Sequence, residues 1–229
     1  MKPGTNVNCD ACPYIDHPVV IVGSNRFCAE VMGSFINACI PAKWESFERI
    51  KDVPQPDTAD GSAWRLIFIN CLGVSNDKLL DLLKNQAPPF LMHDIVALFN
   101  LTRNNTDIPQ LIDLGVRGFF FENDQADYII KGICALKNGE LWVARGALME
   151  YVCQRPKMAD PEEPPGARLT PREKDVLVLL ASGASNKEIA AHLYISPLTV
   201  KTHIYNTLTK LGVQNRLQAA LWAAANLKP

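Results

Sequence analysis

The chain has 229 residues, 48% of them hydrophobic and 21% charged, so it can bury a core in one large or two modest soluble domains. No apolar run approaches the roughly 18 residues of a membrane span, and the N-terminus lacks a basic-then-apolar signal, so we expect a cytoplasmic protein. Residues 168–229 hold 8 basic and 3 acidic side chains, while residues 1–167 hold 15 and 21, which predicts an anionic partner for the C-terminal part alone.

The seven cysteines favour reduced thiols, because an odd number does not fit a disulfide framework. Cys9 and Cys12 have C-x-x-C spacing, but a zinc site needs two more ligands, and the sequence has no second C-x-x-C and no H-x₃-H. We therefore expect no metal site, and we interpret residues 1–16 as a flexible N-terminal segment.

Residues 17–155 alternate between strand-like and helix-like segments. Apolar runs predict strands at 18–23, 65–70, 94–101 and 118–121, with 43–50 as the candidate for the second strand along the chain. Helical periodicity marks 26–40, 77–86, 107–115 and 126–139. In the first of these helices Phe27, Val31, Phe35 and Ile36 share one face. Continuous apolar strands between helices predict an α/β, doubly wound, five-stranded parallel sheet of the flavodoxin-like type.

Two further segments follow this predicted domain. The stretch "NGELWVARGALMEYV", residues 138–152, predicts an extra C-terminal helix. The stretch "QRPKMADPEEPPGAR" then contains four prolines and one glycine among charges, which predicts a linker at 156–167.

Residues 168–229 predict an all-α domain of four helices with well-defined ends. Thr170, Ser185 and Ser196 stand at the N-cap positions of the first three helices, and Gly183 and Gly212 close the first and third. The fourth helix covers 215–227. Two short helices joined by a tight turn, at about 185–204, predict a helix-turn-helix.

The third helix of this domain has two different faces. Its spacing predicts a buried stripe of Val200, Ile204, Leu208 and Leu211. On the opposite face stand a cation, hydroxyls and a phenol, which suit phosphate and base-edge contacts; these residues are Lys201, Thr202, Tyr205 and Thr209. The alternative is the solvated face of a small helical bundle.

The motifs "LTPRE", "GASNKEIA", "TVKTH" and "KLGVQNRLQA" resemble, in order and spacing, the LuxR/FixJ-type helix-turn-helix over residues 168–225. The resemblance implies a DNA-binding transcriptional regulator whose third helix enters the major groove. By position it implies DNA contacts from Thr199, Lys201, Thr202 and Tyr205, and phosphate contacts from Lys210, Asn215 and Arg216. It also implies that the last helix pairs two domains as a homodimer on double-stranded DNA.

The preceding domain resembles a response-regulator receiver that has lost its phosphate chemistry. The phosphoacceptor aspartate of that family stands at the end of the third strand, where this chain has Asn70, and an amide cannot form a phosphoaspartate. The acidic residues that hold Mg²⁺ are replaced by Ser24 and Asn25, and the lysine after the fifth strand is replaced by Glu122. This pattern predicts a non-phosphorylatable receiver and argues against a metal-dependent enzyme.

The arrangement of an extra helix after the receiver resembles that of the CsgD/VpsT branch of these regulators. Members of this branch control biofilm matrix genes. VpsT-like members carry W-[F/L/M]-[T/S]-R at the start of this helix and bind cyclic di-GMP there as dimers. This chain has Trp142, Val143, Ala144 and Arg145. On a helix, positions i and i+3 would place the indole and the guanidinium on one side. Ala144 removes a hydroxyl that could reach a phosphate.

Two functional hypotheses remain open at this point. The first is a DNA-binding regulator with no resident cofactor that is controlled by cyclic di-GMP. The second keeps the DNA binding but makes the receiver a ligand-independent module for dimerisation or protein docking, with Trp142 packed and Arg145 solvated.

Overall fold

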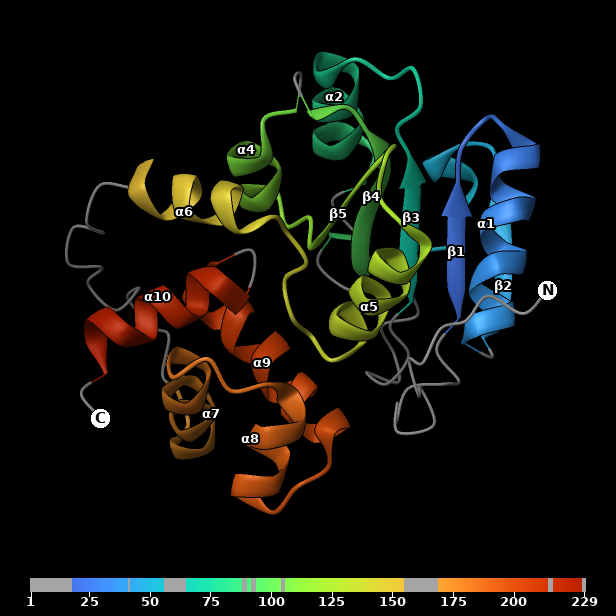
Figure 1. Ribbon diagram of the computed structural model, residues 1–229. Coiled ribbons are helices and arrows are strands. Elements are labelled where there is room, and N and C mark those ends of the chain that lie inside the picture. The colour runs from blue at the N-terminus through green and yellow to red at the C-terminus, as the bar shows by residue number, and fades with distance from the viewer. Residues whose placement is uncertain are drawn as a thin grey trace. The chain divides into compact units, whose positions relative to one another are not determined.

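The computed structural model describes residues 18–40, 42–55, 65–87, 90–91, 94–103, 106–154, 169–213 and 216–227. The chain divides into two compact units, residues 1–144 and 145–229, each described here by itself (Figure 1). The expected flexible N-terminus (1–16) and linker (156–167) lie outside the described residues. The predicted domain boundaries therefore stay predictions, and helix α6 (Arg145–Gln154) is described with the C-terminal unit.

The N-terminal unit is built on a five-stranded parallel sheet, as the sequence predicts. Its strands are β1 (Val19–Val22), β2 (Trp44–Phe47), β3 (Leu66–Asn70), β4 (Ile95–Leu101) and β5 (Gly118–Phe121). Neighbouring strands are parallel throughout, in the order β2-β1-β3-β4-β5. This is the flavodoxin-like order of a doubly wound fold, so the predicted fold class is confirmed.

Burial explains why the sequence predicts some strands more clearly than others. Every side chain of β1 and β5 is buried, because helices cover both faces of a doubly wound sheet. Strand β2 lies at one edge of the sheet, and its central residues Glu45 and Ser46 are exposed. Its mixed composition follows from that position, and it is why 43–50 is only a candidate in the sequence.

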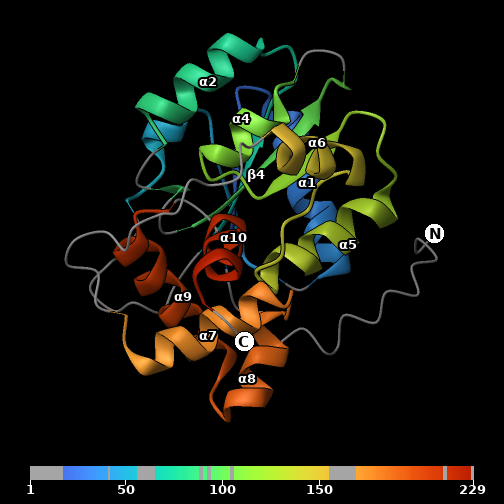
Figure 2. The same ribbon diagram turned by 90° about the vertical axis from the view of Figure 1, so that its left-hand side faces the viewer.

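The helices that flank the sheet in the described residues include α1 (Arg26–Cys39), α2 (Asn76–Asn85), α4 (Ile108–Asp113) and α5 (Ala126–Lys137). Helices α1 and α5 lie on one side, and α2 and α4 lie on the other (Figure 2). Left-handed glycines, Gly115 (φ 101°) and Gly139 (φ 81°), follow α4 and α5. A short 3₁₀ turn, Ile50–Asp52, follows β2.

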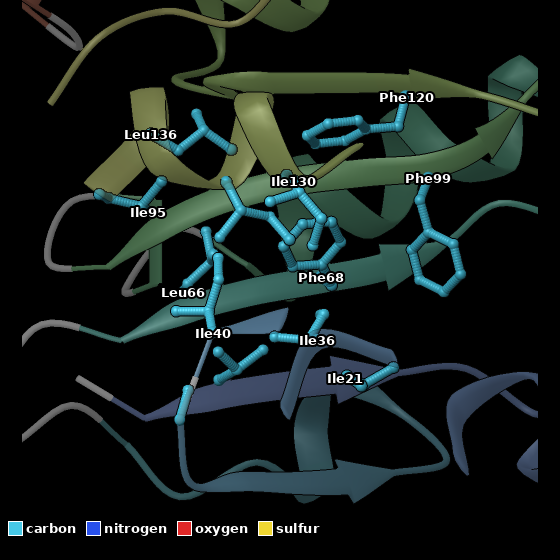
Figure 3. Close-up of a cluster of buried hydrophobic side chains, with 14 of the residues drawn as sticks. Ile21, Ile36, Ile40, Leu66, Phe68, Ile95, Phe99, Phe120, Ile130 and Leu136 are labelled. Atoms are coloured by element: carbon cyan, nitrogen blue, oxygen red, sulfur yellow. The ribbon is translucent and has the colours of Figure 1, made fainter. Parts of the chain in front are cut away.

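The main core lies between the sheet and the pair α1 and α5 (Figure 3). Three phenylalanines from neighbouring strands form its centre: the ring centroid of Phe68 is 5.9 Å from that of Phe99 and 5.4 Å from that of Phe120. Aliphatic side chains from α1, such as Ile36, and from α5, such as Ile130, complete it. Phe68 and Phe99 lie close to the carboxyl ends of β3 and β4.

The buried face of α1 differs from the predicted one. Phe27 and Val31 are 76% and 51% exposed, whereas Ala29 and Gly33 are buried. A Cβ atom at Gly33 would collide with the indole of Trp44. The small residues therefore let α1 approach the sheet closely, and two of the large residues point to solvent instead.

The C-terminal unit holds the predicted bundle: α7 (Pro171–Ala181), α8 (Asn186–Leu193), α9 (Pro197–Leu211) and α10 (Arg216–Asn226). Thr170 and Ser185 form capping boxes with Glu173 and Glu188, and Ser196 caps α9. These predicted caps are confirmed. Within the described ranges, no helix combines the length and apolarity that crossing a bilayer requires.

Asp94, directly before β4, forms a buried ion pair that supports a prediction on stability. Its carboxylate accepts hydrogen bonds from the backbone N–H and from Nη2 of Arg65, both at 2.8 Å, and its side chain is 0% exposed. Removing one partner of a buried pair costs about 3–5 kcal/mol. We predict that Asp94→Ala lowers the free energy of unfolding by about that amount in urea titrations.

The matched control is Asp52→Ala, which breaks the exposed Arg49–Asp52 pair. We expect it to leave the urea midpoint nearly unchanged, because exposed pairs contribute little. Equal losses in the two variants would contradict the importance assigned to Asp94.

Candidate nucleic-acid interface and receiver pocket

Helices α8 and α9 form a helix-turn-helix that begins at the start of the predicted range 185–204, and α9 continues beyond this range to Leu211. Helix α8 starts at the Ser185 cap and ends at Tyr194, which adopts the left-handed conformation (φ 55°, ψ 42°). The hydroxyl of Ser196 then accepts a hydrogen bond from the Thr199 backbone N–H at 3.0 Å and starts α9. The turn is short because one residue reverses the chain and the second residue after it caps the next helix.

Helix α9 has the two faces that its periodicity predicts. Val200, Ile204, Leu208 and Leu211 are buried in the bundle core. Thr199, Thr202 and Thr209 are exposed, and Tyr205 is half-buried. The outward hydroxyls of Thr202 and Thr209 donate to backbone oxygens of the preceding turn, at 3.2 Å and 3.1 Å. The exposed face is therefore polar and ordered.

Lys201 is less accessible than the sequence predicts. Its side chain is half-buried, and its Nζ atom is shielded from solvent. Lys201 directly follows the buried Val200 and so lies at the border of the buried stripe. A contact from this ammonium group to DNA therefore requires a change of rotamer.

Lys210, which the resemblance makes a phosphate contact, forms an ion pair inside the C-terminal unit. Its Nζ donates to both carboxylate oxygens of Glu173, at 2.7 Å and 2.8 Å. Glu173 also accepts from the Thr170 backbone N–H, at 2.7 Å. The charge of Lys210 is thus neutralised inside the unit, where it joins the end of α9 to the start of α7. The ion-pair partner of Lys210 lies 37 residues away along the chain, and the phosphate contact that the resemblance implies for Lys210 stays a prediction.

The ionisation of Glu173 follows from these bonds. Burial raises the pKa of its carboxyl, but the hydrogen bonds from Lys210 and Thr170 together outweigh burial and hold the pKa below its usual range. The carboxylate is therefore charged at neutral pH, which the bond to Lys210 requires.

Arg216 is also committed to internal contacts rather than turned to solvent. Its Nη1 donates to Oδ1 of Asn186 at 2.9 Å, and its Nη2 donates to the backbone oxygen of Ala184 at 2.6 Å. The guanidinium thus ties the start of α10 to the start of α8. Arg216 therefore has a positioning role within the unit, and the phosphate contact that the resemblance implies for it stays a prediction. The third predicted phosphate contact, Asn215, lies outside the described residues.

The receiver pocket is closed by two asparagines at the carboxyl ends of the central strands. Oδ1 of Asn70 accepts a hydrogen bond from Nδ2 of Asn100 at 2.9 Å and from the backbone N–H of Leu72 at 3.1 Å. Asn100 has a left-handed backbone (φ 57°), and its Nδ2 also lies 3.5 Å from Sγ of Cys28. A Cβ atom at Gly23 would lie 2.7 Å from Cβ of Asn70, so the β1–α1 turn leaves no space there.

The groups around this pocket do not form a metal site. Asn25 accepts from the Cys28 backbone N–H at 3.0 Å as the cap of α1, and Ser24 and Glu122 are exposed. Across the described ranges, no three His, Cys, Asp or Glu residues stand close enough to hold a metal ion. Asp124 accepts from the Phe121 backbone N–H at 2.7 Å and lies 3.6 Å from the Arg103 guanidinium, so it shapes the β5–α5 turn.

Trp142 does not stand on a helix. Its backbone forms a parallel bridge with Gly118: the Trp142 N–H donates to the oxygen of Arg117 at 2.8 Å, and the Phe119 N–H donates to the oxygen of Trp142 at 3.0 Å. Helix α6 starts at Arg145. The prediction of a helix that starts with both residues on one side is therefore wrong, because the chain first pairs with the edge strand β5.

The indole of Trp142 packs on α5. Its ring centroid lies 4.7 Å from that of Tyr128, and a Cβ atom at Gly132 would lie 2.6 Å from its Nε1. Burial, and then the charge of Asp124, raise the pKa of Tyr128. The indole is half-buried, and its Nε1 is shielded without a hydrogen-bond partner in the described part of the chain. Arg145 is exposed. This geometry agrees with the packing interpretation of Trp142.

Residues 167–223 match the LuxR family of bacterial regulatory proteins. The nitrate/nitrite response regulator protein NarP of Escherichia coli (strain K12) is 33% identical over 156 residues, which cover 68% of this chain and 70% of that protein. This chain belongs to the LuxR-type response regulators. The match to NarP is longer than the C-terminal unit, so the likeness is not confined to the helix-turn-helix.

Similarity to csgAB operon regulators supports the predicted CsgD branch. The probable csgAB operon transcriptional regulatory protein of Salmonella typhimurium is 37% identical over 113 residues, 49% of this chain and 52% of that protein. The chain thus matches about half the length of this relative. A crystal structure of the regulatory domain of the master biofilm regulator CsgD matches 60% of this chain and 100% of that chain, at 11% identity and a TM-score of 0.46. The sequence relatives are regulators and not enzymes, as predicted.

Proposed function

We propose that the protein is a transcriptional regulator that binds double-stranded DNA through the outward face of α9. The observation that carries this proposal is the helix-turn-helix of α8 and α9, in a unit that matches the LuxR family. Residues 168–229 have five more basic than acidic side chains, which attracts a polyanion. Thr199, Thr202 and Tyr205 offer hydroxyl groups to base edges and phosphates, and Lys201 adds a cation once its rotamer changes.

Homodimerisation is part of this proposal, because a symmetric dimer reads a palindromic site. Two helices offer apolar surface for it. Helix α10 has the half-buried Leu217, Ala220 and Leu221, and α6 has the exposed Met149 and Val152.

We further propose that the receiver is not controlled by phosphorylation. Asn70 stands at the end of β3, and its amide oxygen is already engaged by Asn100 and Leu72. The absence of an acidic cluster from the described residues supports the same conclusion. A receiver without this chemistry needs another input, or serves only as a dimerisation or docking module.

Cyclic di-GMP is the input that the resemblance to the CsgD/VpsT branch suggests, and biofilm matrix genes are the corresponding targets. The exposed guanidinium of Arg145 can stack on guanine and pair with phosphate. Because the indole of Trp142 packs on α5, such binding would depend on Arg145 and on the exposed edge of the indole. The same packing favours the second candidate, a ligand-independent module for dimerisation or docking.

If α9 recognises specific bases, a variant of Lys201 should lose more affinity for the operator than for random DNA. We expect Lys201→Ala to weaken binding to a selected operator by roughly 1–3 kcal/mol and binding to random duplex by less. Lys174→Ala, at an exposed position of α7, is the control for charge alone. Fluorescence anisotropy titrations on both duplexes measure this difference. Equal effects of the two variants on both duplexes would contradict base reading by Lys201.

The pocket geometry predicts that Asn70→Asp alone does not create a phosphorylatable receiver. The variant would still lack the acidic residues at Ser24 and Asn25 and the cation at Glu122. Incubation with acetyl phosphate and Mg²⁺, followed by mass spectrometry of the intact protein, measures the outcome. Stoichiometric addition of a phosphoryl group would show that this account of the pocket is wrong.

The cyclic di-GMP proposal predicts opposite effects from two variants. Arg145→Ala should abolish ligand-dependent dimerisation, whereas Ala144→Thr should tighten ligand binding about tenfold or more, since a hydrogen bond to a charged group contributes roughly 1.5–3 kcal/mol. Arg26→Ala, an exposed arginine on α1, is the control. Sedimentation velocity with and without ligand tests all three. A wild-type protein that dimerises equally in both conditions, without binding the ligand at high micromolar concentration, favours the ligand-independent module.

A further inference from the structure

Three helices of the C-terminal unit end in a residue with left-handed backbone conformation. Gly183 (φ 86°) follows α7 and Gly212 (φ 66°) ends α9, whereas Tyr194 (φ 55°) ends α8. Glycine adopts this conformation without steric cost, but a side chain with a Cβ atom does not. Two of these three left-handed positions are thus occupied by glycine, and the third is occupied by a tyrosine.

The left-handed cap lets the backbone N–H groups of Tyr194 and Ile195 donate to the oxygen of Ala190, but a glycine in this position would form the same bonds without the strain. The side chain of Tyr194 is 94% exposed, so its ring adds almost nothing to the core. Its hydroxyl group forms no hydrogen bond with the residues that the structure describes. Strained, exposed residues of this kind occur preferentially at functional sites, and tyrosine is common where one end of a side chain meets an apolar surface and the other a polar one.

The position of Tyr194 indicates what it contacts. In a bound helix-turn-helix the first helix crosses the DNA backbone, and the N-terminus of the second helix enters the major groove. Tyr194 is the residue that links the two, two residues before the Ser196 cap of α9. In such a complex the turn lies between the DNA backbone and the major groove, so an outward side chain on the turn faces the sugars and phosphates at the edge of the groove.

On this basis we infer that Tyr194 is a phosphate-binding residue, a role that rests on the proposed DNA binding. Its phenol O–H donates to a phosphate oxygen at the groove edge, and its ring packs on the adjacent deoxyribose. Such a contact positions α9 but does not read sequence. It is also uncharged, so it strengthens binding without releasing a counterion.

The test compares Tyr194→Phe and Tyr194→Gly with wild type in the full-length protein. Gly183→Tyr is the matched control: it places a tyrosine in the left-handed position after α7, where a Cβ atom meets no atom within 4 Å. Each protein is titrated by fluorescence anisotropy against a duplex selected by the wild-type protein and against a random duplex, at two salt concentrations. Thermal unfolding of each variant is measured in parallel.

We expect Tyr194→Phe to weaken binding about tenfold on both duplexes, because a hydrogen bond to a charged group is lost, and to leave the salt slope unchanged. Tyr194→Gly should bind at least as weakly as Tyr194→Phe, yet have a Tm equal to or above that of wild type because the backbone strain is relieved. Gly183→Tyr should lower the Tm and leave the affinity unchanged.

Three results would overturn the inference. Wild-type affinity of Tyr194→Phe for both duplexes would exclude the phosphate contact. A loss confined to the selected duplex would mean base reading, and a changed salt slope would mean an indirect effect on a cation. If wild type binds neither duplex, the proposed DNA binding itself fails, and this outcome is distinct from the other three.

Discussion

The carboxylate of Glu173 is the interaction on which the C-terminal unit depends. It is buried, it accepts the Thr170 N–H that starts α7, and it holds the ammonium group of Lys210 near the end of α9. A buried charge is stable only when it is paired and hydrogen-bonded, so the bonds from Thr170 and Lys210 are coupled through one side chain. The guanidinium of Arg216 ties α10 to α8 in a similar way. The first contact joins α9 to α7, and the second joins α10 to α8.

In the N-terminal unit a flavodoxin-like sheet carries two hydrogen-bonded asparagines at the carboxyl ends of neighbouring strands. The aromatic core around Phe68 lies close to the ends of β3 and β4, and the receiver family that this domain resembles carries its phosphoacceptor at the end of the third strand. Asn70 and Asn100 lie near these strand ends, and their side-chain amides form a hydrogen bond. An amide pair has no charge to gain or lose near neutral pH, so this edge of the sheet has one electrostatic state.

The sequence predicts the elements well, because apolar runs and caps are local signals. The order of strands, the capping boxes at Thr170 and Ser185, and the buried stripe of α9 all follow from residue patterns. It does not predict features that depend on distant partners, such as Glu173 for Lys210. The bridge between Gly118 and Trp142 also cannot be predicted from the neighbouring sequence, because an apolar residue pairs with a sheet edge as readily as it starts a helix. Asn100 and Tyr194 stand out only once their backbone angles are known.

The central claim is that this protein is a DNA-binding regulator whose receiver does not act through phosphorylation. The most direct measurement is the affinity of the full-length protein for a selected operator duplex, by anisotropy, before and after incubation with acetyl phosphate and Mg²⁺. The account predicts specific binding with the same Kd in both conditions, because Asn70 cannot carry a phosphoryl group. An affinity that rises after this treatment, together with an increase in the protein's mass by one phosphoryl group, would contradict it.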